Sequence, residues 1–283
     1  MLVEDDGRGR KLEERAAQYS IKPPQYRGEE YEKRPSGHGS NSTGEIRLQR
    51  SNPQQNMDTA CPYFRIEMME LYHLLNRGVE KREIVLDDSD RLRFIHDLFI
   101  LNDSENVDPN HRLRDFYKPA SERKCLVNIH AFCLMPNHYH LLVSEVEEGG
   151  ISLFMRKLNM GYAKYFNEKY ERSGVLWQGT FRKILIRRDA HFLYIPFYIH
   201  LNPLDFSARE WRMGRVKNVG RALEYLEEYR WSSFRDYMNI RNFPSLLNTS
   251  LLKDALGSPQ RQTKIIKEII SNPDIARQSE GIE

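Results

Sequence analysis

Cysteines, long apolar runs and an N-terminal export signal are scarce or absent in this sequence. The three cysteines among 283 residues (Cys61, Cys125 and Cys133) are unevenly spaced, so they form neither a disulfide framework nor a CxxC zinc pair. No apolar run approaches the roughly 20 residues that span a bilayer. The first 30 residues place Asp, Glu and Arg where a secretory signal needs an apolar segment. We therefore expect a cytoplasmic protein with reduced thiols and no membrane contact.

A strong excess of charge is also lacking. The 43 basic and 40 acidic residues leave a net charge of +3, which is too small to indicate nucleic-acid binding by itself. The mean hydropathy of −0.69 is low for a chain that is 40% hydrophobic. Much of this deficit lies in residues 1–56, which hold only 12 apolar residues and 6 of the 16 glycines. We predict a disordered N-terminal extension over residues 1–65.

The rest of the sequence predicts alternating strands and helices. Strands are expected near 69–78, on both sides of 135–137 within 125–146, and over 175–186; helices are expected over 88–101, 151–170 and 190–202. This order is that of an α+β, ferredoxin-like or RRM-like split β-α-β sheet with one added C-terminal helix. Pro196 should kink that last helix. We expect one domain at 66–206 and a helical C-terminal extension at 207–283.

His138-Tyr139-His140 lies on an expected strand and is the sharpest local motif. Alternate side chains of a strand share a face, so the two imidazoles point the same way, as two metal ligands would. The alternative is a pair of partly buried histidines with no ligand. In the last helix, Tyr198 and Asn202 are one turn apart, so a hydroxyl nucleophile and an amide ligand could approach one point. Here the alternative is an aromatic core helix.

Basic residues are concentrated between Ile151 and Arg188, where nine Lys and Arg face two acidic residues. Aromatic residues are interleaved with them, including Trp177. Basic side chains neutralise phosphates and aromatic faces stack on unpaired bases, so the segment predicts a DNA-binding track. The alternative is a solvated helix face, with Trp177 in the core. The residues assigned to the track are Arg156, Lys157, Lys164, Trp177, Arg182, Lys183, Arg187 and Arg188.

Five ordered blocks extend these local motifs. They are NRG (76–78), PNHYHLLV (136–143), GYAKYFNEKYERSGVLWQGTFR (161–182), YIHLNP (198–203) and YRWSSFRDY (229–237). Together they resemble the HUH single-tyrosine transposases of the insertion-sequence-200-like group, and in particular the REP-associated tyrosine transposase branch. The resemblance covers roughly residues 70–238.

The resemblance implies specific roles. His138 and His140 match the cation-binding histidines, Tyr198 the nucleophile and Asn202 the third ligand of a divalent metal, Mg²⁺ or Mn²⁺. Rival nucleophiles by residue type are Tyr162, Tyr165 and Tyr170, but none has a ligand-type residue four positions later. The implied reaction is cleavage and rejoining of single-stranded DNA during transposition, through a covalent 5′-phosphotyrosine that leaves a free 3′-OH.

The expected partner is therefore single-stranded or hairpin DNA, and the expected location is the nucleoid within the cytoplasm. The resemblance leaves monomer and homodimer open. The expected enzyme is a transposase that is both an endonuclease and a strand transferase. Two other classes of function are alternatives to it. One is a domesticated protein that binds hairpin DNA in repeats without cutting it, and the other is a structural metal-binding module.

Overall fold

The computed structural model describes residues 70–105, 123–187 and 189–276, without the side chains of residues 189–191. The predicted N-terminal extension and residues 106–122 lie outside the described residues. No helix in these described ranges is long and apolar enough to cross a membrane.

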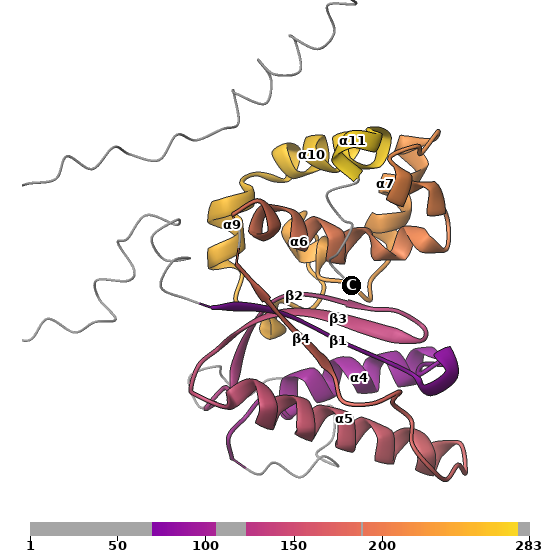
Figure 1. The fold of residues 1–283 in the computed structure, drawn as a ribbon, viewed down its shortest axis with the longest axis vertical. Helices are drawn as coiled ribbons and strands as arrows, with labels where there is room; N and C mark the ends of the chain where they lie inside the picture. The colour runs from indigo at the N-terminus through magenta and orange to yellow at the C-terminus, as the bar shows by residue number, and fades with distance from the viewer. Residues whose placement is uncertain (1–69, 106–122, 188, 277–283) are drawn as a thin grey trace, which may run out of the picture. The chain divides into compact units, whose positions relative to one another are not determined.

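A four-stranded antiparallel sheet is the centre of the fold (Figure 1). Its strands are β1 (Leu71–Arg77), β2 (Val127–Leu134), β3 (His138–Glu145) and β4 (Arg182–Ile186), in the spatial order β2-β3-β1-β4. Helix α4 (Asp88–Ile100) connects β1 to β2, and helix α5 (Gly150–Lys169) connects β3 to β4. The predicted β-α-β-β-α-β order is confirmed.

Local sequence signals explain where these elements begin. The side chain of Asp87 accepts a hydrogen bond from the Asp90 amide, and the side chain of Asp90 accepts one from the Asp87 amide, so the pair forms a capping box that starts α4. The break between β2 and β3 falls at Pro136, as expected. Its turn is closed by the Met135 amide, which donates to the His138 carbonyl at 2.8 Å.

The alternation along β3 sends neighbouring side chains into two separate cores. Tyr139 and Leu141 point to the face covered by α4 and α5, which we call the α4/α5 face. Leu142 points to the opposite face, which is covered by α6 (Asp189–Leu201) and which we call the α6 face (Figure 1). Because His138 and His140 are four and two residues from Leu142, they share the α6 face.

The chain after α6 is helical, as predicted for the extension. Its elements are η4 (Asn202–Asp205), η5 (Arg209–Met213), α7 (Val219–Glu228), α8 (Phe234–Tyr237), η6 (Pro244–Leu246), α9 (Ser250–Leu256), α10 (Pro259–Ser271) and α11 (Pro273–Ala276). Trp211, Leu226 and Ile266 from this region are buried in the same core as the α6 side chains and the α6 face of the sheet. The extension and the sheet therefore share one hydrophobic core.

Two expected elements differ from the structure. Only residues 182–186 of the predicted strand at 175–186 join the sheet. The preceding residues form a loop whose backbone bonds to the end of β1 instead, with the Gln178 amide donating to the Arg77 carbonyl and the Val79 amide to the Leu176 carbonyl, both at 2.9 Å. Helix α6 continues through Pro196 and ends at Leu201, so Asn202 begins η4 with Pro203 at a position that needs no amide donor.

Candidate active site

The two histidines of the HxH motif lie side by side on the α6 face. His138 is 7% exposed and His140 is fully buried, and their ring centroids are 4.9 Å apart in an edge-on arrangement. The Nδ1 atom of His138 is 2.5 Å from the side-chain oxygen of Asn137. The pair therefore has one member at the surface and one beneath it.

His140 has the environment of a metal ligand. Its Nδ1 is 2.9 Å from Nε2 of His73 on β1, and the two rings stack with centroids 5.1 Å apart. Its Nε2 is buried and has no hydrogen-bond partner among the described residues. Burial, followed by the nearby His138, His73 and Arg212, holds the pKa of His140 well below its ordinary value. When His140 donates its Nδ1 proton to His73, the Nε2 lone pair is left to bind a cation.

Tyr198 approaches these histidines from α6. Its ring centroid lies 5.9 Å from that of His140 and 6.2 Å from that of His73, both edge-on. The side chain is 1% exposed. Its hydroxyl accepts a hydrogen bond from Nη1 of Arg212 at 3.2 Å. The predicted nucleophile thus lies beside His140, one of the predicted ligands.

Asn202 lies one turn beyond Tyr198, and both ends of its amide are used. Its Nδ2 donates to the Tyr198 carbonyl at 2.8 Å, and its Oδ1 accepts from Nη2 of Arg212 at 3.1 Å. No group of three His, Cys, Asp or Glu side chains positioned to hold a metal occurs in the described ranges. The predicted set contains two imidazoles and an amide oxygen that keeps a second lone pair, a mixture that fits Mn²⁺ or Mg²⁺.

Arg212 on η5 connects these groups. It belongs to none of the motifs found in the sequence, so the sequence alone did not indicate that it lies at the site. Its guanidinium binds both carboxylate oxygens of Asp205, at 2.9 and 2.7 Å. Burial alone lowers the pKa of Arg212, but the bonds to Asp205 and the neighbouring Tyr198 hydroxyl raise it above its ordinary value. The side chain is therefore charged, with its charge balanced by Asp205.

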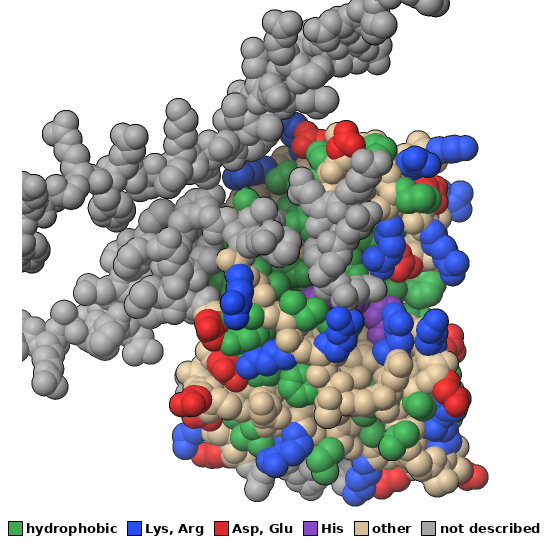
Figure 2. Space-filling model, viewed as in Figure 1, with side chains coloured by type: hydrophobic (Ala, Val, Ile, Leu, Met, Phe, Trp, Pro, Cys, Tyr) green, Lys and Arg blue, Asp and Glu red, His purple; other side chains and the backbone are tan. Residues whose placement is uncertain are grey.

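A surface pocket of about 310 Å³ opens beside His138. Its lining contains three arginines, Arg77, Arg209 and Arg212, together with Asp205. An adjoining pocket of about 340 Å³ also includes Arg77 and adds Arg182. Figure 2 shows several Lys and Arg side chains around the small histidine surface that is visible on this side of the molecule. Several guanidinium groups beside a ligand pair are suited to binding the phosphates of a polynucleotide.

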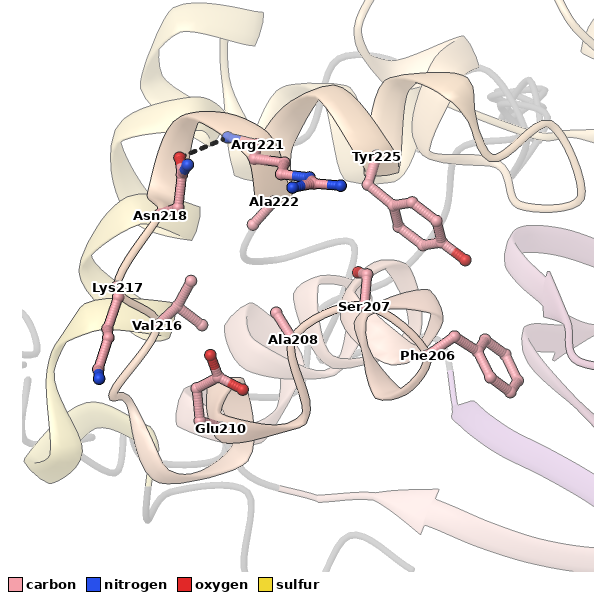
Figure 3. Close-up of a pocket in the computed structure, with 10 residues that line it drawn as sticks. All are labelled: Phe206, Ser207, Ala208, Glu210, Val216, Lys217, Asn218, Arg221, Ala222 and Tyr225. Carbon is pink, nitrogen blue, oxygen red and sulfur yellow. Dashed lines mark hydrogen bonds between the residues drawn. The ribbon is translucent and has the colours of Figure 1, made fainter.

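A third pocket lies farther into the helical extension, between η4–η5 and α7 (Figure 3). It measures about 590 Å³ and is lined by Glu210, Lys217, Arg221 and Tyr225 among others. Half-exposed Phe206 lines both this pocket and the one beside His138. None of the predicted site residues lines the third pocket.

The predicted basic track is divided between two faces of the sheet. Arg156, Lys157 and Lys164 lie on α5, which covers the α4/α5 face, away from Tyr198. Lys157 donates to the carbonyls of Asp103 and Glu105, and Lys164 is 3.7 Å from Glu168. These α5 residues and the histidine pair are therefore not brought together.

The basic residues of β4 are closer to the histidines. Arg182 pairs with Leu75, which in turn pairs with His140, so the three residues share the α6 face. Lys183 points to the other face, where its ammonium lies 4.0 Å from the Tyr72 ring centroid and 3.7 Å from Glu145. Arg187 is exposed just past the end of β4, and Arg188 lies outside the described residues.

Aromatic residues of the same block are packed into the α4/α5 core. Trp177 donates its indole proton to the Asn159 carbonyl at 2.8 Å and packs edge-on to Tyr139, which favours the core alternative for Trp177. The hydroxyl of Tyr162 donates to the Ile84 carbonyl, and those of Tyr165 and Tyr170 donate to Asp90. The rival tyrosines therefore lie on the α4/α5 side, where the histidine pair does not point.

Comparison with protein families gives a match to part of the chain. Residues 104–202 match the family described as "Transposase IS200 like". The match supports the resemblance over this part of the chain and suggests DNA transposition. The matched range includes His138, His140, Tyr198 and Asn202, but it excludes His73 and Arg212.

Comparisons with individual proteins add one similar structure. No curated protein matches the chain. Among solved structures the chain is similar to one described as "Structure of the REP associates tyrosine transposase bound to a REP hairpin". The two chains are 14% identical, the alignment covers 65% of this chain and 87% of the other, and the TM-score is 0.39.

Proposed function

We propose that this protein is a metal-dependent enzyme that cuts and rejoins single-stranded or hairpin DNA, with Tyr198 as its nucleophile. The observation that carries the proposal is the convergence of Tyr198 with His140, whose buried Nε2 has no hydrogen-bond partner in the described part of the chain. The match of residues 104–202 to a transposase family supports DNA as the substrate. The REP-associated branch and action at the nucleoid belong to the same proposal.

His138, His140 and Asn202 would hold the cation, which when bound polarises the scissile phosphate and offsets the charge that develops in the transition state. The Tyr198 hydroxyl attacks phosphorus and releases its proton to solvent water, which in turn supplies the proton for the leaving oxygen. A bond from the tyrosine oxygen to phosphorus forms as the bond from phosphorus to the 3′ oxygen breaks, and that oxygen takes up a proton. Because the phosphotyrosine conserves a phosphodiester bond, a 3′-OH from another DNA end can reverse the step without ATP.

The arginines that line the pocket beside His138 would bind the DNA strand during this reaction. Arg77 and Arg209 present positive charge at the mouth of the pocket, and Arg182 extends it toward the edge strand β4. These side chains would bind phosphates on either side of the scissile one and so orient the strand. This assignment places the DNA track across the α6 face.

The test measures whether the protein forms a covalent adduct with DNA. Full-length protein is incubated with a labelled single-stranded hairpin DNA and Mn²⁺, and the products are separated on a denaturing gel. Wild type should give a protein-linked band that requires the metal, whereas Tyr198→Phe should give none. Absence of an adduct with both Mn²⁺ and Mg²⁺, or an adduct that persists in Tyr198→Phe, would overturn the proposal.

The burial of Tyr198 favours one alternative, a protein that binds hairpin DNA without cutting it. Its hydroxyl is buried and accepts a hydrogen bond from Arg212, as expected for a tyrosine that does not act as a nucleophile. In that case the same hairpin would shift in a native gel, and no metal would yield an adduct.

A further inference from the structure

One guanidinium joins the three polar groups at the base of the proposed active site. Arg212 donates to Oη of Tyr198 at 3.2 Å, to Oδ1 of Asn202 at 3.1 Å and to both carboxylate oxygens of Asp205. It comes from η5, beyond the 104–202 range of the family match. The segment after the matched domain therefore reaches the atoms proposed to react.

The placement of Arg212 is braced on several sides. Trp211, which is fully buried, donates its indole proton to Oδ1 of Asp205 at 2.7 Å and packs with its ring centroid 6.1 Å from that of Tyr198. Gly214 ends η5 with a φ of 62°, and a Cβ there would lie 2.3 Å from the backbone of Asn272. Only glycine permits this close approach, so η5 is fixed against the junction of α10 and α11.

The planar guanidinium fixes its partners relative to one another. Nη1 serves Tyr198 and Nη2 serves Asn202, and these two nitrogens have an invariant separation within the fork. Because Asp205 neutralises the guanidinium, the arrangement places little net positive charge beside a bound cation. A lysine could keep the charge but could not bind both oxygens with the same geometry.

We propose that Arg212 is a positioning residue that holds the nucleophilic oxygen of Tyr198 at a fixed place relative to the Oδ1 ligand of Asn202. The inference rests on the proposed function and extends it, because it makes the C-terminal extension a part of the catalytic unit. A chain cut after residue 206 would keep His138, His140, Tyr198 and Asn202 but would lack the guanidinium that aligns Tyr198 with Asn202.

The kinetic test compares three full-length variants under single-turnover conditions with saturating hairpin DNA and Mn²⁺. Arg212→Lys should slow adduct formation by about 100-fold, the scale of a 1 Å misplacement, while DNA affinity stays close to that of wild type. Arg212→Ala should be at least as slow, and added ethylguanidinium should recover part of its rate. Arg215→Ala, which removes an exposed charge three residues away, should react at the wild-type rate.

A second measurement reads position without cleavage. With 3-fluorotyrosine at position 198, the ¹⁹F resonance should be a single sharp line in the otherwise wild-type protein and in Arg215→Ala. It should shift or broaden in Arg212→Lys, at an unchanged melting temperature. If the wild type forms no adduct, the proposed function fails, but the fluorine line still decides whether Arg212 positions the ring. An unchanged line, or an Arg212→Lys rate equal to wild type, overturns the inference.

Discussion

The two faces of the sheet differ in how the polar atoms of their buried side chains are hydrogen-bonded. On the α4/α5 face, Tyr139 gives its hydroxyl proton to Asn159, Trp177 bonds the backbone of the same residue, and both lie within an apolar and aromatic core. On the α6 face, His140 is buried as completely, yet its Nε2 has no hydrogen-bond partner in the described chain. Leaving a buried polar atom unpaired costs about 1–3 kcal/mol, and the proposed cation would offset that cost at His140.

The contrast is sharpest between adjacent residues of β3. Tyr139 and Leu141 flank His140 in sequence and point to the opposite core. The proposed site and the α4/α5 core are thus on opposite sides of one sheet. Substitution of Leu141 should lower stability and leave the reaction intact, whereas substitution of His140 should act mainly on the reaction.

The largest expected effect on the reaction is that of Tyr198→Phe. The ring continues to pack against Trp211 and His140, and only the oxygen that would attack phosphorus is lost. Adduct formation should fall below detection while hairpin affinity, measured by fluorescence anisotropy, changes by less than about twofold, or 0.4 kcal/mol. A large loss of affinity would mean that the hydroxyl contacts DNA in the bound state.

The next comparison uses the neighbours His140 and Leu141. His140→Ala should weaken Mn²⁺ binding in calorimetry by more than the 10–100-fold typical of residues that only support a ligand. Leu141→Ala should keep Mn²⁺ affinity but lower the free energy of unfolding by about 2–5 kcal/mol, since it leaves a cavity in the α4/α5 core. If His140→Ala bound Mn²⁺ like wild type, the ligand assignment would be wrong.

A substitution of Trp177 tests whether this residue belongs to the α4/α5 core or to the DNA-binding track. Trp177→Ala should cost about 3 kcal/mol of stability, at the low end for tryptophan because the side chain is half-buried. Hairpin affinity should not change, whereas loss of a base-stacking residue would weaken binding by about 1–3 kcal/mol. Chemical unfolding and anisotropy on the same variant distinguish the two outcomes.

A smaller effect is expected for His73, which touches His140 but is not a proposed ligand. His73→Ala should weaken Mn²⁺ binding by about 10–100-fold, because the His140 ring would lose the partner that fixes its tautomer. His73→Gln, which can accept the Nδ1 proton, should recover part of the affinity. Equal affinity in wild type and His73→Ala would show that the ring orientation is fixed by packing alone.

The smallest expected effect distinguishes the two sides of β4. Arg182→Ala should flatten the slope of log affinity against log salt by about 0.7, the value for one phosphate contact on a single strand. Lys183→Ala should leave the slope nearly unchanged, because Lys183 lies over Tyr72 on the other face. A greater effect for Lys183 would place the DNA on the α4/α5 side.

Local sequence patterns predicted the parts of this molecule that local chemistry decides. The break at Pro136 and the shared face of His138 and His140 follow from residues a few positions apart. The loop before β4 could not be predicted from neighbouring residues, because Gln178 bonds the end of β1, about 100 residues away in sequence. Propensity alone could not exclude a strand there.

The residues that sequence reasoning missed are those placed by distant pairings. His73 meets His140 only through the register of β1 against β3, across 67 residues. Arg212 meets Tyr198 through the path of η4 and η5, which has no periodic pattern. Charge along the sequence likewise could not show that α5 and β4 direct their basic residues to different faces. Arg77 had a signal, since it belongs to the NRG block.

The central position of β1 has a consequence for how the protein folds. This strand is synthesised first, but both of its neighbours, β3 and β4, are distant in sequence, so the sheet closes only through contacts of high sequence separation. Helices α4 and α5 can form earlier from local contacts. The groups from His73 to Arg212 can meet only after η5 has been synthesised. A nascent chain that ends before η5 thus carries the tyrosine and the histidines but lacks the arginine proposed to position Tyr198.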